Sequence, residues 1–217
     1  MKNIVKTSRL AGQLEKLFNK LNADFFNGEL ETPVITIQST PKAYGHYSLS
    51  PLWEVKDGAK HEINIGAGTL DRPIEEVVAT LLHEMVHMWN DTVLNVQDCS
   101  GSSKMYHNKA FRDACLSHGL TCSRSEKYGY SHTEPSNMLI EWILDNDVQE
   151  IMMNRNEPHG IRIAGGNATA NGGAATTGTA SKGHSIRYKC PVCGQLARTT
   201  KTARLICGDC LVPMLES

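Results

Sequence analysis

The sequence lacks an excess of charge of either sign and any long run of apolar residues. Its 217 residues carry 22 basic and 23 acidic side chains, a formal net charge of −1. This balance excludes a polybasic arm and an acidic disordered tail, and it leaves only a local basic patch as a means of attracting nucleic acid. The longest apolar runs, such as Val77–Leu82, are interrupted and far shorter than the roughly 20 residues that cross a bilayer.

The first residues also lack the features of a secretory signal. Lys2, Lys6 and Arg9 are spread through Met1–Gln13, and no apolar segment separates them. We therefore expect a cytoplasmic protein without a membrane partner. Because that compartment is reducing, we do not expect the seven cysteines to form disulfides.

Between Ala164 and Ser181 the sequence lacks both charged residues and large apolar side chains. Every residue in this stretch is Ala, Gly, Asn, Thr or Ser, and such a composition cannot offset the entropy lost when a chain becomes ordered. The sequence therefore predicts three parts: a first domain over residues 1–160, a flexible linker over 161–183 and a small module over 184–217.

The apolar pattern of the first part predicts an α+β fold, with helices packed on a small, mostly antiparallel sheet. A turn or hairpin is expected over Leu49–Lys60, which contains Pro51 and Gly58. The expected helices cover about Ser8–Asn27, Asp71–Asn90, His107–His118 and Asn137–Met153, and the expected strands cover Val34–Gln38, Ala43–Ser48 and His61–Ile65.

The second expected helix carries an H-E-x-x-H pattern over residues 83–87. His83 and His87 lie one turn apart on one face of the helix, so both imidazoles can bind one zinc ion. Glu84 lies beside them, where its carboxylate can take a proton from a water that attacks a carbonyl. The pattern thus predicts two metal ligands and a catalytic glutamate; the alternative is a buried helix with two hydrogen-bonded core histidines.

A catalytic zinc site of this kind needs a third protein ligand. His107 is the expected one, because it follows a polar loop and begins the next helix, which can bring it back across the first. Five other residues remain candidates for this role: His118, His132, Asp91, Asp98 and Cys99.

The last part of the chain contains two C-x-x-C pairs. Cys190 and Cys193 form the first pair, and Cys207 and Cys210 form the second. Four thiolates with this spacing can close a tetrahedral structural zinc site, and a module this small needs the metal in order to fold. Strands expected over Ile186–Lys189 and Ala203–Ile206 would complete a small β zinc ribbon. A redox role for a C-x-x-C pair is the alternative, but it would need only one pair.

Three basic residues lie between the two cysteine pairs. Arg198, Lys201 and Arg204 alternate with threonines, and together they can contact the phosphates of a nucleic acid. A solvated ribbon surface explains the same residues equally well.

Five segments, in a fixed order, carry a resemblance to a known family. They are Leu21–Leu30, Gly45–Tyr47, Ile63–Ile65, Thr80–His87 and Tyr106–Phe111. In this order they resemble the SprT-like family, which includes the Spartan proteases, over about Thr7–Cys122. Many bacterial members of that family end in a zinc ribbon.

The resemblance implies a zincin-like domain that hydrolyses peptide bonds with zinc. His83, His87 and His107 would bind the catalytic zinc ion, Glu84 would be the general base, and a structural zinc ion would fold the ribbon. The family usually has Gly after the third histidine, where this chain has Asn108. Asn accepts a positive φ better than most residues, so the turn can persist. Tyr44, His46, Tyr47 and Tyr106 are candidates for stabilising the oxyanion, although each also fits a packing role.

The resemblance also implies a class of substrate. Spartan-type proteases act on proteins attached to DNA, so the expected partners are a protein substrate and DNA, either single-stranded or crosslinked to protein. The expected source is a bacterium or phage, with the protein in the cytoplasm near the nucleoid. Two alternatives stay open: a non-catalytic, DNA-associated zinc protein, and a metallopeptidase with no nucleic-acid role.

Overall fold

A computed structural model of the chain describes residues 6–40, 43–101, 105–151, 153–155, 186–199 and 202–216. The predicted linker, 161–183, and Lys201 lie outside these ranges. No helix in the described ranges is both long enough and apolar enough to cross a membrane. The α-helices of the described residues are α1 (Thr7–Phe25), α2 (Ile74–Thr92), α3 (Lys109–Ser117) and α4 (Asn137–Asp145).

The described strands of the first part form small sheets, so the fold is mixed α/β. One sheet has the order β1–β5–β2, a second is the β3–β4 hairpin, and a third has the order β6–β7–β9–β8. The strands are β1 (Val34–Gln38), β2 (Gly45–Tyr47), β3 (Trp53–Val55), β4 (Gly58–Lys60), β5 (Glu62–Gly66), β6 (Cys99–Ser100), β7 (Tyr106–His107), β8 (Leu120–Ser125) and β9 (Gly129–Pro135).

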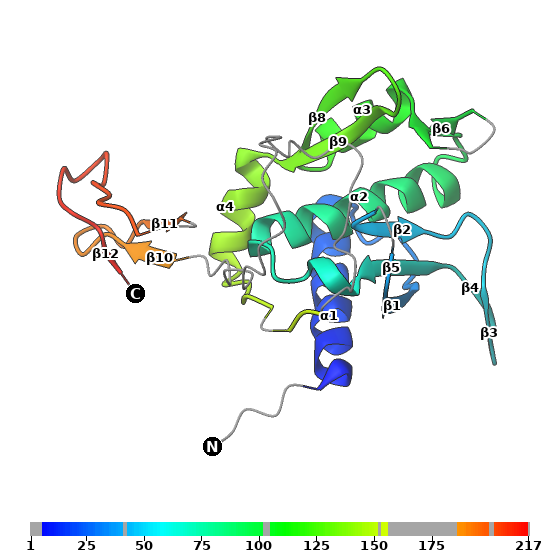
Figure 1. Ribbon diagram of the computed structural model, residues 1–217, viewed down its shortest axis with the longest axis horizontal. Helices are drawn as coiled ribbons and strands as arrows, with labels where there is room; N and C mark the ends of the chain where they lie inside the picture. Colours follow the sequence, from blue (N-terminus) through cyan, green and yellow to red (C-terminus); the bar gives the residue numbers. More distant parts are fainter. Residues whose placement is uncertain are drawn as a thin grey trace, which may run out of the picture.

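Helix α2 runs through the centre of the first part (Figure 1). The β1–β5–β2 sheet lies on one side of it, and α3, β8 and β9 lie on the other. Because α2 is covered on both sides, its apolar residues surround most of the helix instead of forming one stripe. Burial of each large apolar side chain stabilises the fold by about 1.5–3 kcal/mol. The fully buried ones on α2 include Val77, Leu81, Leu82, Met85 and Val86.

The β1–β5–β2 sheet is mixed, whereas the sequence predicts mostly antiparallel pairing. Strand β5 pairs in parallel with β1 and antiparallel with β2. A parallel pair needs a long crossover connection, and here β2 and the β3–β4 hairpin lie within that connection. The hairpin occupies the predicted turn over Leu49–Lys60.

Helix α4 is shorter than its apolar pattern predicts. It ends at Asp145, because Asp147 adopts a φ of 48° and the Val148 amide then binds the Ile143 carbonyl at 3.1 Å. The apolar residues beyond this point still pack on the core, so the pattern reports burial correctly but not helix length.

The C-terminal module forms a three-stranded sheet of order β11–β10–β12. Its strands are β10 (Ile186–Lys189), β11 (Leu196–Thr199) and β12 (Leu215–Glu216). Strand β10 lies where the sequence predicts it. The second predicted strand is wrong: β10 pairs with β11, which follows the first cysteine pair directly, and Ala203–Ile206 contributes only a bridge from Ile206 to Pro213.

Candidate metal centre

Two elements bring three histidines together beside the centre of the fold. Helix α2 carries His83 and His87, and β7 carries His107. One ring nitrogen from each lies within 4.8 Å of the others, and the Nε2 atoms of His87 and His107 are 3.1 Å apart. Nitrogens on one tetrahedral zinc ion lie about 3.4 Å apart, so these three imidazoles fit zinc in both donor type and spacing.

Each histidine is held by its other ring nitrogen. Nδ1 of His83 lies 2.9 Å from the Thr133 hydroxyl, and Nδ1 of His87 lies 2.7 Å from Asp98 Oδ2. Nδ1 of His107 lies 3.2 Å from the Met105 carbonyl. Carboxylate and carbonyl oxygens only accept, so Nδ1 carries the proton in His87 and His107, and Nε2 keeps its lone pair for a metal.

Asp98 is a buried carboxylate that accepts a hydrogen bond from His87. It also accepts a hydrogen bond of 3.0 Å from the Asn90 side chain. Burial opposes ionisation of Asp98, but the hydrogen bonds from His87 and Asn90 outweigh it and hold the pKa of this carboxyl below its usual value. Asp98 therefore stays charged and fixes the orientation of the His87 ring.

Burial keeps two of the histidines neutral. It lowers the pKa of His83 well below the ordinary value, and the neighbouring His87 and His107 lower it further. Burial, followed by the effect of His87, lowers the pKa of His107 to about 4. Only neutral imidazole binds a metal, so both rings are ready to bind at neutral pH.

The Phe111 ring lies against all three histidines. Its centroid is 4.7 Å from that of His83 and 4.5 Å from those of His87 and His107. Phe111 is fully buried on α3. It forms an apolar wall that restricts the rotation of the imidazoles and keeps water away from that side.

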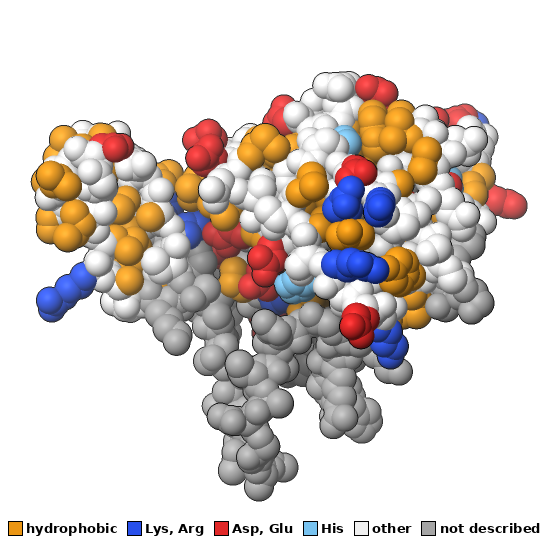
Figure 2. Space-filling view, turned by 90° about the horizontal axis from the view of Figure 1, so that it is seen from above, with side chains coloured by type: hydrophobic (Ala, Val, Ile, Leu, Met, Phe, Trp, Pro, Cys, Tyr) orange, Lys and Arg blue, Asp and Glu red, His pale blue; other side chains and the backbone are white. Residues whose placement is uncertain are grey.

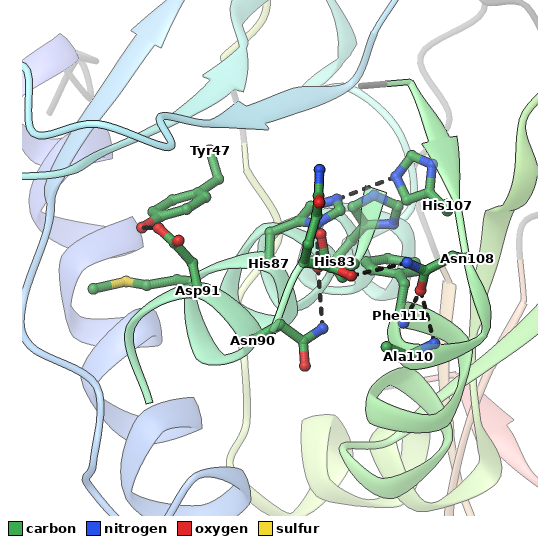
Figure 3. A network of polar contacts seen from close by, with 12 residues as sticks. Tyr47, His83, His87, Asn90, Asp91, His107, Asn108, Ala110 and Phe111 are labelled. Carbon is green, nitrogen blue, oxygen red and sulfur yellow. Dashed lines mark hydrogen bonds and ion pairs between the residues drawn. The ribbon is translucent and has the colours of Figure 1, made fainter. Parts of the chain in front are cut away.

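Asn108 places His107 in a way that the sequence does not predict. His107 lies in β7, not at the start of a helix, and α3 begins only at Lys109. Asn108 has a φ of −90°, so its backbone does not adopt the positive φ that a glycine at this position would allow. Instead it caps α3 (Figure 3): its side-chain oxygen accepts from the amides of Ala110 at 2.8 Å and Phe111 at 3.3 Å.

Glu84 is buried next to the histidines. Burial raises the pKa of its carboxyl to about 7, against the opposing effects of His87 and of a hydrogen bond from the Tyr47 amide. Strand β2 passes so close that a Cβ on Gly45 would lie 3.1 Å from Glu84 Oε1. A carboxyl with a pKa near neutral pH can both accept and return a proton, as a general base does.

The other candidate ligands have different partners. Asp91 binds the Tyr47 hydroxyl, and His118 stacks on Phe26. His132 contacts Glu134 at 3.2 Å. Cys99 pairs with His107 across β6 and β7, and its thiol lies within 4.8 Å of the ligand atoms of His87 and Asp98.

The candidate oxyanion residues also have partners elsewhere. The Tyr44 ring lies under the Arg72 guanidinium at 3.8 Å, and His46 Nε2 is 3.7 Å from Glu62. The Tyr106 hydroxyl accepts from Arg124 at 3.3 Å. With Tyr47 bound to Asp91, each of the four has a partner of its own.

The C-terminal module brings its four cysteines together. The thiols of Cys190, Cys193, Cys207 and Cys210 lie within 4.8 Å of one another. The two pairs fold alike: the Gly194 amide returns to the Cys190 carbonyl at 3.0 Å, and the Leu211 amide returns to the Cys207 carbonyl at 2.8 Å. Both returning residues have a positive φ. Four converging thiols in two matching turns fit a structural zinc ion.

The predicted basic patch lies on the C-terminal module, and its two described residues, Arg198 and Arg204, differ in exposure. Arg198 is only 10 % exposed, because it binds Glu150 at 3.1 Å and the Val148 carbonyl at 3.2 Å. Arg204 is exposed, and Lys201 lies outside the described residues. In this conformation Arg198 therefore faces the first domain instead of a nucleic acid.

Sequence reasoning misses Thr133, Met105 and the full role of Phe111. Thr133 lies on β9, 50 residues after His83, in a polar segment without apolar alternation. Of these three residues, only Phe111 could have been found from the sequence, because the family resemblance includes an aromatic residue at this spacing after His107. Asp98 is one of the candidates for the third ligand in the sequence, whereas in the structure it contacts the Nδ1 atom of His87.

The comparison with protein families gives one match. The model of the SprT-like family matches residues 14–126, a range that includes His83, Glu84, His87 and His107. No curated protein and no solved structure gives a match. The match agrees with the resemblance to this family in the sequence, and the C-terminal module lies outside the matched range.

Proposed function

Since the chain belongs to the SprT-like family, we propose that its three-histidine centre is the active site of a zinc metallopeptidase with a zincin-like catalytic domain. One observation carries the proposal. Three imidazoles each bring one ring nitrogen within 4.8 Å of the others, and a buried carboxyl, Glu84, lies beside them. A purely structural metal site has no need of that carboxyl.

His83, His87 and His107 would hold the catalytic zinc ion. When bound, zinc supplies a Lewis acid that polarises a carbonyl and makes a water more acidic. Glu84 accepts the proton of the attacking water at its carboxylate and delivers it to the leaving amine. The positive charge of a bound zinc ion would also favour the ionised form of Glu84, which would oppose the effect of its burial.

Strand β2 is the proposed docking edge for the peptide. It lies at the edge of the β1–β5–β2 sheet, and its backbone passes directly beside Glu84. An extended peptide that added to this edge would gain main-chain hydrogen bonds, and its scissile bond would lie near the histidines.

The proposed substrates are proteins associated with DNA or crosslinked to it. Family membership and the exposed Arg204 on the ribbon support this assignment. The ribbon would bind a second, structural zinc ion through its four cysteines.

A second candidate is a metallopeptidase whose ribbon binds protein instead of DNA. Two observations favour it: Arg198 is bound to Glu150, and hydrophobic side chains gather on the ribbon (Figure 2). The exposed ones there are Val192, Ile206, Leu211 and Leu215.

Glu84→Gln tests the catalytic proposal. The variant should retain both zinc ions, measured by elemental analysis, and lose about 10²–10⁴-fold in hydrolysis of an unstructured protein. Normal activity in this variant would contradict the proposed base. Loss of zinc from the three-histidine centre would show that Glu84 is needed to hold the metal.

The same assay, with and without single-stranded DNA, separates the two candidates. Faster cleavage of a DNA-bound protein than of the same protein free, reduced by Arg204→Glu, supports the DNA-associated substrate. Equal rates would favour the ribbon as a protein-binding module.

A further inference from the structure

Tyr47 joins β2 to α2 at two points. Its hydroxyl donates to Asp91 Oδ2 at 2.8 Å, and its main-chain amide donates to the Glu84 carboxylate. Glu84 and Asp91 lie seven residues apart on α2, which places them two turns apart on one helix face. One residue of the strand therefore contacts this face at both Glu84 and Asp91, and Figure 3 shows the Tyr47 hydroxyl beside Asp91.

The hydroxyl contact is enclosed and specific. His61 stacks on the Tyr47 ring at 5.2 Å, and its Nδ1 lies 2.7 Å from the Ser48 carbonyl and 2.8 Å from the Tyr47 oxygen. Because His61 donates its Nδ1 proton to these oxygens, the Tyr47 proton is directed to Asp91. Burial, followed by the contact with Asp91, raises the pKa of Tyr47 above its usual value, so the hydroxyl remains a donor.

The contact matters because of the place of β2 in its sheet. The strand is three residues long and lies at the edge of its sheet, paired with β5 on one side only. Gly45, at its other end, leaves no space between the strand and Glu84. A small shift of β2 would therefore move both the amide that orients Glu84 and the edge beside it.

We propose that Tyr47 and Asp91 are positioning residues that hold β2 against α2 and thereby fix the orientation of the Glu84 carboxylate. Neither side chain contacts the reacting atoms. The catalytic consequence of this pair rests on the proposed function, whereas its effect on β2 does not.

The test compares Tyr47→Phe, Asp91→Ala, their double variant and the conservative Asp91→Asn. Tyr128→Phe and Asp145→Asn are matched controls, since one removes a tyrosine hydroxyl and the other a carboxylate outside this contact. Zinc content is measured first. Hydrogen exchange of the peptide that covers residues 44–48 then reports on β2, and kcat and KM report on hydrolysis.

We expect both single variants to keep zinc, to exchange the β2 amides faster, and to lose about tenfold in kcat with little change in KM. The double variant should be no worse than the more severe single variant, because both substitutions break the same hydrogen bond. Asp91→Asn keeps an acceptor oxygen and should restore part of the loss. The controls should match the unsubstituted protein.

Unchanged exchange of β2 in Tyr47→Phe and Asp91→Ala would overturn the inference. So would a loss of stability with normal kcat, since that is the result of a purely structural contact. If the unsubstituted protein hydrolyses nothing, the proposed function fails, and the exchange data alone decide whether the pair holds β2.

Discussion

Asp98 Oδ2 lies 2.7 Å from His87 Nδ1, and this contact joins the loop after α2 to the helix that carries His83 and His87. The Asp98 main chain also binds the other side of the centre, because its carbonyl accepts the Asn108 amide at 2.9 Å. Asp98 thus connects the second histidine with the segment that carries the third.

Asp98→Asn should lower the affinity of the three-histidine centre for zinc by about 10–100-fold. The amide has nearly the same shape, but it lacks the charge that fixes the His87 tautomer and strengthens its Nε2 as a donor. Competition with a chromophoric chelator measures the change. Asp113→Asn, on an exposed aspartate that binds Arg112, is the control, and equal affinities in the two variants would contradict the role of Asp98.

Asn108→Ala should destabilise the first domain by about 1 kcal/mol, because the amides of Ala110 and Phe111 lose their cap. Asn108→Gly should lower the free energy of unfolding by only about a few tenths of a kcal/mol, because glycine is itself tolerated as a cap. Urea unfolding gives both values. Equal losses in the two variants would show that the cap is not what Asn108 contributes.

Gly129→Ala should weaken zinc binding at the histidines. Gly129 has a φ of 63° and pairs with His107, and a methyl group there would overlap the His107 carbonyl. Gly28→Ala is the matched control, because its φ is 73° but nothing lies within 4 Å of the added methyl. Both variants carry the backbone strain, so a loss of zinc affinity confined to Gly129→Ala identifies the clash. Equal zinc affinity in the two variants would contradict the proposal that the contact between β9 and His107 supports metal binding.

Acid should destabilise the protein partly through His118. Burial lowers the pKa of this histidine in the folded state, whereas its pKa in the unfolded chain is about 6.5. Between the two values the unfolded chain binds more protons, so the free energy of unfolding falls as the pH drops below about 6.5. His118→Gln should lose the packing on Phe26 at every pH but show a shallower decline between about pH 7 and pH 5. Parallel pH profiles would refute this assignment.

The sequence predicts the central helix of the fold better than the strands that pack around it. Helix α2 follows from its apolar pattern, and the placement of Glu84 beside two histidines follows from helix geometry alone. The β8–β9 hairpin does not, because Leu120–Ser125 is mostly small and polar and lacks the alternation that marks a half-buried strand. Its pairing is set by contacts with α2 and α3, which no local pattern contains.

For the third histidine, too, the sequence predicts one feature correctly and another incorrectly. His107 is identified from its place after the polar loop and from the family resemblance, yet the predicted helix start there is wrong. The side-chain oxygen of Asn108 caps α3, which begins at Lys109, two residues after the predicted start. Asp98 and His107 are both reasonable ligands in sequence, and only their distances distinguish a residue that would bind the metal from one that holds its ligand.

Thr133, Asp98 and the Met105 carbonyl hold the outer nitrogens of the three histidines, and this would affect how a metal enters and leaves. The entropy lost in ordering three imidazole rings is lost when the domain folds, and not when an ion arrives. The three rings therefore already lie in place for an ion, and the proposed zinc ion could leave and return without unfolding of the domain. The C-terminal module differs, because its core is too small to keep four thiols together, so a zinc ion bound there would be gained or lost together with the fold.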